Sequence, residues 1–439
     1  MMSRVFLSFL GTNDYVPCTY FRGDHEAANV RFVQEAILRN ECRKWTSRDR
    51  GLIFTTVQAH DGNWLDNGQI DRKTDKPLAR TGLKRCIDRI GLPFSVERVE
   101  IPDGKSEAEI WRIFSIVFDS LKNGEEVVFD VTHAFRSLPM LAIVILNYAK
   151  VMKEITLDGI FYGAFEVLGN IYEAKKLPVE ERRVPILELT AFDQLMDWSF
   201  AVNQFLKAGN AGQIKSLARS NLKQILTESR GQDKGAVTIR GIGDRLEEYC
   251  HILSTCRGPE IGSAAIALKE KMRGFDDFHM LPPFRPLFER VKTKLAPFGK
   301  NALSDGVAAA RWCYEHNLIQ QAYTILVELL ISHFVLRGGG DVDDTGERDI
   351  VSGALAIAAR SIPRKDWYPK NRDNSEKTTK YLEVCEAKME LVKIWQVLVD
   401  YRNDINHAAF QKDYKSASAF QRKMLQLIDR LEEYEQERN

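Results

Sequence analysis

The segment RNDINH at positions 402–407 carries the side chains that metal-free cleavage of RNA requires. Such cleavage needs a group that moves a proton at the attacking 2′-hydroxyl or the leaving 5′-oxygen, and a cation that stabilises the charge developing on the phosphate. We expect His407 to transfer protons, Arg402 to bind the phosphate, and Asn403 to orient this pair or the ribose. Because no carboxylates or histidines cluster at the spacing of metal ligands, we expect no metal requirement.

The spacing of Arg402 and His407 restricts how they can meet. On a straight helix, side chains five residues apart point about 140° away from each other. The two converge only if the segment bends, which the short polar side chains at 403, 404 and 406 favour, or if two copies of the motif meet across a dimer axis. The alternative is an ordinary salt bridge for Arg402 and a surface position for His407.

A second pair with the same spacing, Arg311 and His316, shows how weak the bare motif is. About 0.6 Arg-x4-His pairs are expected by chance in a chain of this composition. We interpret Arg311 and His316 as a decoy, because the apolar residues that follow them indicate a buried helix and no amide follows the arginine.

Polar residues also follow three predicted strands of the N-terminal half. In an open parallel sheet, ligands bind beyond the carboxyl ends of the strands, where loop amides and helix N-termini point outward. The residues that we expect to face a ligand there are Gly11, Thr12, Asn13, Gly104, Lys105, Thr132, His133 and Arg136. Together they suit a phosphodiester, whereas the sequence has no glycine motif for a dinucleotide or a triphosphate. In the alternative interpretation, Thr132 caps a helix, His133 packs, and Arg136 pairs with a carboxylate.

Composition indicates a soluble globular protein of two or three domains, with 439 residues, 44% of them hydrophobic and 28% charged. The seven scattered cysteines, never spaced as CxxC, favour a reducing compartment over zinc or disulfides. The N-terminal apolar run resembles a strand more than a signal peptide, and the longest apolar stretch, 140–146, is too short to span a bilayer. We therefore expect a cytoplasmic protein without membrane contact. A net charge of only +1 restricts any nucleic-acid contact to a local pocket.

Alternating strand-like and helix-like segments predict a parallel α/β sheet over about the first 180 residues. The predicted strands are 5–10, 52–57, 96–101 and 127–131, each apolar enough for burial on both faces. A capping-box pattern at Ser106 and Glu109 predicts a helix to 121. The segment 138–152 is apolar nearly all round, which indicates a sandwiched helix that also contacts a second subunit. Segments 160–167 and 171–175 predict an antiparallel hairpin.

From about residue 185 onward the sequence predicts helices only, broken at glycines 209, 231, 258 and 274 and at prolines 282 and 283. Two long helices are predicted over 312–336 and 391–401, with a polar stretch from 338 to 380 between them. The basic segment around Trp367 in that stretch is typical of a solvated loop, and a path for single-stranded RNA is the alternative.

Five segments together, LSFLGTNDY, IPDGKSEAE, DVTHAFRSLP, FYGAFE and RNDINH, resemble the type III CRISPR-associated proteins that join a CARF sensor domain to a HEPN ribonuclease. The resemblance implies an α/β plus all-α architecture, with a Rossmann-like CARF domain over 1–185, a helical connector over 186–300 and a HEPN domain over 301–439. It further implies a homodimer or higher homo-oligomer. One cyclic oligoadenylate, with tetra-adenylate favoured and hexa-adenylate possible, would bind on the two-fold axis, and Arg402, Asn403 and His407 of both subunits would form a composite cleft.

The function that this resemblance implies is a cyclic oligoadenylate-activated, metal-independent endoribonuclease that cleaves single-stranded RNA in antiviral defence. Activation requires the ligand to bind the active arrangement of the dimer more tightly than the inactive one. Two alternatives stay open. One is a ligand-gated transcription regulator that uses the basic segment 214–230 as a recognition helix, and the other is an inactive HEPN interaction protein.

Overall fold

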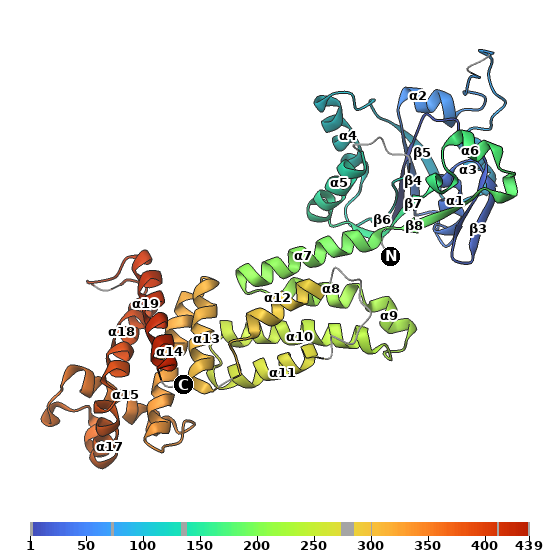
Figure 1. The fold of residues 1–439 in the computed structure, drawn as a ribbon. Helices are drawn as coiled ribbons and strands as arrows, with labels where there is room; N and C mark the ends of the chain where they lie inside the picture. The colour runs from blue at the N-terminus through green and yellow to red at the C-terminus, as the bar shows by residue number, and fades with distance from the viewer. Residues whose placement is uncertain are drawn as a thin grey trace. The chain divides into compact units, whose positions relative to one another are not determined.

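The protein divides into two compact units, Met1–Gln194 and Leu195–Asn439. The structure is a computed structural model that describes residues 3–71, 74–132, 138–273, 285–299, 301–410 and 412–437. Every strand among these residues belongs to the first unit, and the second unit is built from helices (Figure 1). The predicted α/β plus all-α fold class is therefore confirmed at this level.

The first unit contains one sheet of eight strands in the order β3-β2-β8-β7-β6-β1-β4-β5. Its strands are β1 (Arg4–Leu10), β2 (Cys18–Arg22), β3 (His25–Val30), β4 (Arg50–Thr55), β5 (Ser95–Glu100), β6 (Glu126–Asp130), β7 (Thr156–Gly163) and β8 (Arg183–Glu188). The five strands β7-β6-β1-β4-β5 are parallel to one another. Numbered along the chain, they follow the order 5-4-1-2-3, which is the Rossmann arrangement. The four predicted strands are β1, β4, β5 and β6. The burial on both faces predicted for each is wrong for β5, which lies at the edge of the sheet and has no buried residue.

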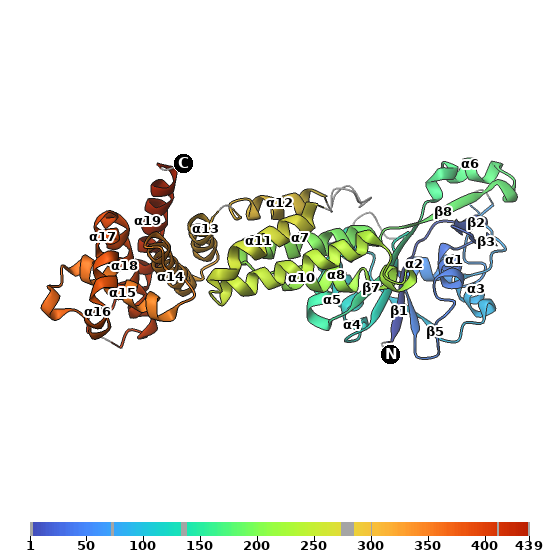
Figure 2. The ribbon, with the colours of Figure 1, turned by 90° about the horizontal axis from the view of Figure 1, so that it is seen from below.

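Helices cover both faces of this sheet because successive strand residues point to opposite faces. Val5, Leu7 and Phe9 of β1 pack in the core beneath α4 (Glu107–Ser120) and α5 (Leu138–Lys153). Phe6 and Leu10 belong to the opposite core, together with residues of α1 (Val33–Asn40) and α3 (Leu83–Ile90). Figures 1 and 2 show α4 and α5 on one side of the strands and α1 and α3 on the other.

The predicted hairpin over 160–175 is wrong. Strand β7 ends at Gly163, and residues 171–176 form the helix α6 (Ile171–Lys176). The Asn170 side chain accepts bonds from the N–H groups of Tyr172 and Glu173, and the Glu173 carboxylate accepts from Asn170 N–H, which is a capping box. The antiparallel partner of β7 is β8.

The helix predicted over 138–152 is α5, and other elements cover it on one side rather than on both. One side of α5 packs on the sheet through Ala142, Ile145, Leu146 and Ala149. The other side is exposed within the chain, and its large apolar residues are Met140, Ile143, Val144, Tyr148, Val151 and Met152. Met140, Val144, Tyr148 and Val151 follow one another at four and three residues, with Ile143 and Met152 beside them. These residues form one apolar stripe, which we call the α5 stripe.

The second unit is all helical. Its helices are the C-terminal part of α7 (Thr190–Ala208), then α8 (Gly212–Ser220), α9 (Lys223–Glu228), α10 (Lys234–Ser254), α11 (Ile261–Arg273), α12 (Arg285–Leu295), α13 (Ala302–Glu315), α14 (Ile319–Arg337), α15 (Thr345–Arg360), α16 (Pro369–Asp373), α17 (Ser375–Glu386), α18 (Met389–Asn406) and α19 (Ala417–Gln436). One hydrophobic core runs from Trp198 to Leu431. The boundary predicted at residue 300 therefore divides helices that share a core.

One prediction about these helices is wrong. The expected helix over 312–336 is two helices, because Asn317 adopts φ +58° and ends α13. The polar stretch from 338 to 380 is largely helical, since Asp344 caps α15 by accepting bonds from the N–H groups of Gly346 and Glu347.

Helix α14 is the only described helix that is long and apolar enough to cross a membrane by length and composition. It packs instead among other helices of the second unit, and Tyr323, Leu326, Leu330 and Phe334 on it are fully buried. We therefore interpret α14 as a core helix of this unit.

Candidate functional site

Strands β1 and β6 lie side by side at the point where the strand order reverses. In an open α/β sheet this is where ligands bind, beyond the carboxyl ends of the strands. Gly11, Thr12 and Asn13 follow β1, and Thr132 follows β6, so the structure brings these four predicted residues to the same edge of the sheet. We call it the sheet crevice.

Two amide side chains hold the loop after β1 through hydrogen bonds. The Asn63 Nδ2 atom donates to the carbonyl oxygens of Gly11 and Asn13, both at 2.9 Å, and Gln69 Nε2 donates to that of Thr12 at 3.2 Å. These bonds occupy only the carbonyl oxygens of the loop. They fix its backbone, as preorganised recognition requires.

A charged cluster lies beside this loop, and the sequence patterns did not predict it. The Asp14 carboxylate accepts bonds from Arg31 at 3.3 Å, Arg80 at 3.2 Å and Lys175 at 3.1 Å. Burial opposes ionisation of Asp14, but the hydrogen bonds and charges of Arg80 and Lys175 outweigh it and lower the pKa. Three cations around one carboxylate leave a positive excess at the crevice, which favours an anionic ligand.

The Thr132 hydroxyl forms hydrogen bonds with two neighbouring groups of the protein. It donates to Asp130 Oδ1 at 2.5 Å and accepts from Gly163 N–H at 2.8 Å. The other oxygen of Asp130 accepts from Ser8 Oγ at 2.7 Å, which joins β1 to β6. We therefore assign Thr132 the role of fixing the ends of β6 and β7. Its ligand contact stays a prediction, and the alternative helix cap involves residues 133–137, which lie outside the described residues.

The other predicted ligand-facing residues follow a strand farther from this loop or lie outside the described residues. Gly104, with φ +72°, and Lys105 follow β5, which is separated from β1 by β4. The exposed Lys105 ammonium pairs with Asp103 at 2.5 Å. His133 and Arg136 lie outside the described residues.

The predicted catalytic segment ends helix α18. The helix continues without interruption to Asn406, and the His407 N–H still donates to Asn403 O at 2.9 Å. The predicted bend is therefore wrong. The side chains expected to cause it bind elsewhere: Asp404 accepts from Lys415, and Asn406 accepts from Gln320. Of the two ways in which Arg402 and His407 could meet, the approach of two copies is left.

Charged side chains position Arg402, but they do not occupy all of its N–H donors. Its Nη1 atom lies 3.4 Å from Glu328 Oε1 of α14, and its Nη2 atom donates to Asn403 Oδ1 at 3.3 Å. Its Nε atom is buried and has no acceptor among the described residues. Glu328 is itself fixed by Arg348 at 2.7 Å, and Arg348 also donates to Ser332 at 2.7 Å. Arg402 thus keeps donor capacity for an anion.

His407 lies at the exposed start of the loop that follows α18. The next two residues, Ala408 and Ala409, have φ of +51° and +63°, which side chains larger than glycine adopt only at a cost. The buried carboxylate of Asp404 accepts from the N–H of Lys415 at 2.8 Å and so ties the far end of this loop to α18. The loop thereby holds His407 at the helix end.

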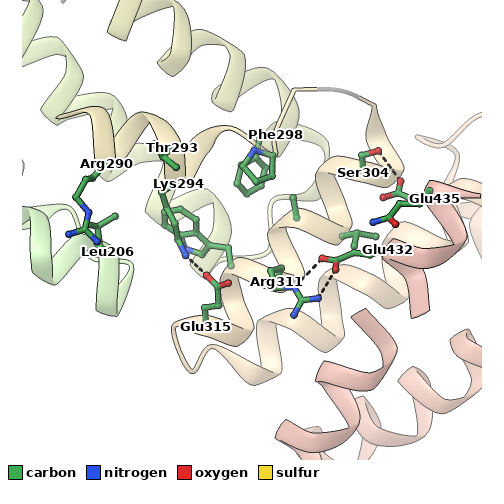
Figure 3. Close-up of a pocket in the computed structure, with 15 residues that line it drawn as sticks. Leu206, Arg290, Thr293, Lys294, Phe298, Ser304, Arg311, Glu315, Glu432 and Glu435 are labelled. Atoms are coloured by element: carbon green, nitrogen blue, oxygen red, sulfur yellow. Dashed lines mark hydrogen bonds and ion pairs between the residues drawn. The ribbon is translucent and has the colours of Figure 1, made fainter. Parts of the chain in front are cut away.

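The second Arg-x4-His pair is structural, as predicted. Arg311 forms ion pairs with Glu432 and Asp429 of α19, both at 2.6 Å, and Figure 3 shows it turned toward Glu432 in a cavity of about 540 Å³. His316 is buried, and its ring nitrogens lie 2.7 Å from Trp312 O and 3.1 Å from Leu206 O.

Two cations of one other basic segment are paired, and the tryptophan of another is buried. In 214–230, Lys215 pairs with Glu247, and Arg219 pairs with Asp244 at 2.9 Å. Trp367 is only 8% exposed, so the stacking surface considered for RNA is covered, and its segment forms short helices rather than a solvated loop. Within the described residues, no three His, Cys, Asp or Glu side chains gather to hold a metal ion.

The fold and this site define a protein that combines a Rossmann-type α/β unit with an all-α unit carrying an incompletely paired arginine. No family model matches the chain. The chain is similar to the CRISPR-associated protein MJ1674 of Methanocaldococcus jannaschii, with 27% identity over 125 residues. The match covers 28% of this chain and 18% of that relative, so it spans less than a fifth of the relative's length.

Asp130 makes the sheet crevice sensitive to pH. Burial raises the pKa of Asp130 to about 6, although hydrogen bonds from Thr132 and Ser8 oppose the shift. Because the folded carboxyl holds its proton more tightly than the unfolded one, its contribution to stability is lost as pH rises from about 4 to 6, by on the order of 3 kcal/mol.

Hydrogen exchange of β6 amides should show this loss of stability in the parent and not in Asp130→Asn. The exposed variant Asp88→Asn should behave like the parent, and a parent profile that is flat between pH 4 and 6 would refute the assignment.

Proposed function

We propose that the chain is an endoribonuclease of type III CRISPR antiviral defence, activated by a cyclic oligoadenylate and independent of metal ions, that cleaves single-stranded RNA in the cytoplasm. The first unit is the CARF-type sensor, and the HEPN-type nuclease lies in the second. The similarity to a CRISPR-associated protein supports the biological setting. The site geometry supports the chemistry, as follows.

The observation that carries the proposal is the state of Arg402. A guanidinium that is 25% exposed and held by one long ion pair of 3.4 Å is preorganised to bind an anion. His407 lies exposed at the end of the same helix, where a substrate can reach its imidazole. Phosphate binding and proton transfer are the two roles that RNA cleavage through the 2′-hydroxyl requires.

The sheet crevice supports the sensor role. It lies at the switch point of a Rossmann-ordered sheet, its loop is fixed by Asn63 and Gln69, and Arg31, Arg80 and Lys175 surround it. A fixed loop beside a positive cluster suits the phosphates of a cyclic oligoadenylate, for which we favour the tetra-adenylate. Activation then follows if this ligand binds the active dimer more tightly than the inactive one.

The α5 stripe supports a homodimer. Val144 is 53% exposed and Val151 is 79% exposed, although both lie on a helix whose opposite side packs in the core. A contiguous apolar stripe of this kind marks a contact surface. Two copies joined there would bring two sensor units together, as a ligand shared on the dimer axis requires.

The nuclease assignment can be tested with a quenched single-stranded RNA reporter in EDTA, with and without cyclic tetra-adenylate. Cleavage should require the activator and persist without metal. His407→Ala should lower the rate at least about 100-fold, because it removes the proton-transferring group. Arg311→Ala serves as the matched control and should retain the rate of the parent. Full activity in His407→Ala would refute the proposed site.

The dimer can be tested by replacing Val144 and Val151 with glutamate. The double variant should sediment near the monomer mass of 50.2 kDa, whereas the parent should sediment near twice that mass. Charges in an apolar contact oppose association strongly, since each must be desolvated without a partner. Val167→Glu, at a residue 56% exposed outside the stripe, should not change the mass. A dimeric double variant would place the contact elsewhere.

A further inference from the structure

Helices α8, α9, α10 and α11 of the second unit pack around a cavity of about 710 Å³, and Figure 1 shows these helices together. We call this cavity the connector cleft. The charged residues that line it are four cations and one carboxylate, namely Arg219, Lys223, Arg240, Lys271 and Asp244. Their formal charge is +3, although the whole chain carries only +1. The cleft therefore concentrates positive charge, and such a concentration attracts anions.

Three of the four cations in the cleft lack an acidic partner. Arg219 pairs with Asp244 at 2.9 Å, which occupies the one carboxylate of the lining. Lys223, Arg240 and Lys271 form no ion pair with any residue that the structure describes. They come from three different helices, α9, α10 and α11. Like charges gathered around one cleft repel one another, and an anion bound between them offsets that repulsion.

Gly241 of α10 makes room for one of these cations. A Cβ atom at this position would lie 2.6 Å from Lys271 Cε and 3.3 Å from Lys271 Nζ. Carbon atoms that are not bonded to each other do not approach as closely as 2.6 Å, so any larger residue would displace the end of the lysine side chain. Glycine is unfavourable inside a helix. Here it lets the side chain of Lys271 lie across α10 at the cleft.

The rest of the lining indicates which anion fits. Leu226 and Val237 contribute apolar contacts, and no aromatic side chain lines the cleft among the described residues. Recognition of unpaired bases relies on aromatic side chains for stacking, whereas lysine and arginine bind phosphates whatever the base. A duplex is read by an element that protrudes into its groove, and a concave cleft instead admits a flexible strand. The lining therefore favours the backbone of a single-stranded nucleic acid.

We propose that the connector cleft binds the phosphate backbone of the single-stranded RNA substrate through Lys223, Arg240 and Lys271, as a second contact besides Arg402. This inference rests on the proposed function and adds to it a site that captures RNA away from the cleaved bond. Contacts to phosphates alone carry no sequence information, so the capture is independent of base. It affects only RNA that is long enough to occupy both sites.

The first test measures RNA binding without cleavage. The full-length His407→Ala protein is titrated with a fluorescent oligouridylate of about 30 nucleotides at several salt concentrations. Each phosphate contact with a single strand contributes about 0.7 to the slope of log affinity against log salt concentration. Additional replacement of Lys223, Arg240 and Lys271 with alanine should lower this slope by about 2 and weaken binding at least about tenfold at low salt.

Two further variants make this test specific to the cleft. Gly241→Ala keeps every charge but displaces Lys271, so it should weaken binding about threefold. Arg257→Ala removes an exposed cation outside the lining and should leave affinity and slope unchanged. An unchanged slope in the triple alanine variant, or an equal loss in Arg257→Ala, overturns the proposal. A duplex DNA of the same length that binds the cleft more tightly than the single strand also overturns it.

The second test separates capture of RNA from cleavage. With activator, replacing the three cations with alanine should raise KM at least about fivefold for a reporter of about 30 nucleotides and leave kcat unchanged. A reporter of about four nucleotides, which fills one binding site, should be cleaved equally by the variant and the parent. An unchanged KM on the long reporter, or equal losses on both, overturns the proposal. If the parent cleaves neither reporter, the proposed function fails, and the salt dependence of binding still decides the role of the cleft.

Discussion

The proposed chemistry depends on the Arg402 guanidinium, which is held in place although not all of its N–H donors have an acceptor among the described residues. Arg348 fixes Glu328, and Glu328 holds Arg402 through one long ion pair, while the buried Nε atom of Arg402 has no acceptor among the described residues. A fully paired arginine such as Arg311 has its donors committed to carboxylates and would have to lose them to bind a phosphate. Arg402 can bind an anion without breaking a strong interaction first.

The two units position their site residues in different ways. In the sheet crevice, side-chain amides hold backbone carbonyls, and the buried Ser8–Asp130–Thr132 network joins neighbouring strands. In the helical unit, ion pairs between α14, α15 and α18 set the arginine, and a loop with left-handed residues sets the histidine. Both arrangements depend on residues distant in the sequence, so each site exists only in the folded chain.

Local patterns predicted the parts of this structure that depend on local sequence. The apolar runs of β1, β4 and β6 and the Ser106 cap of α4 could be predicted because burial on two faces and capping leave direct signatures in the sequence. The capping box at Asn170 was equally local, but apolar residues on both sides of it resembled two strands. Asn317 ended a helix that its apolar neighbours seemed to continue, because a left-handed residue changes the backbone without changing the periodicity.

The sites were predictable only in part, for a related reason. The residue types at 402–407 and at 11–13 indicated chemistry, and strand order placed Gly11, Thr12, Asn13 and Thr132 together. No spacing in the sequence relates Glu328 or Arg348 to Arg402, or Arg31 and Lys175 to Asp14, since these partners are 17 to 161 residues apart. Thr132 had the right type for a ligand contact, but the Asp130 and Gly163 groups that use its hydroxyl come together only through the pairing of β6 with β7.

The straight course of α18 makes one claim central: Arg402 of one subunit and His407 of its partner act on the same phosphate. Mixing Arg402→Ala with His407→Ala tests it most directly, because a mixed dimer retains one arginine and one histidine on different subunits. After subunit exchange and addition of activator, the account predicts RNA cleavage at least about tenfold above that of either variant alone. A mixture no more active than its components would contradict the account.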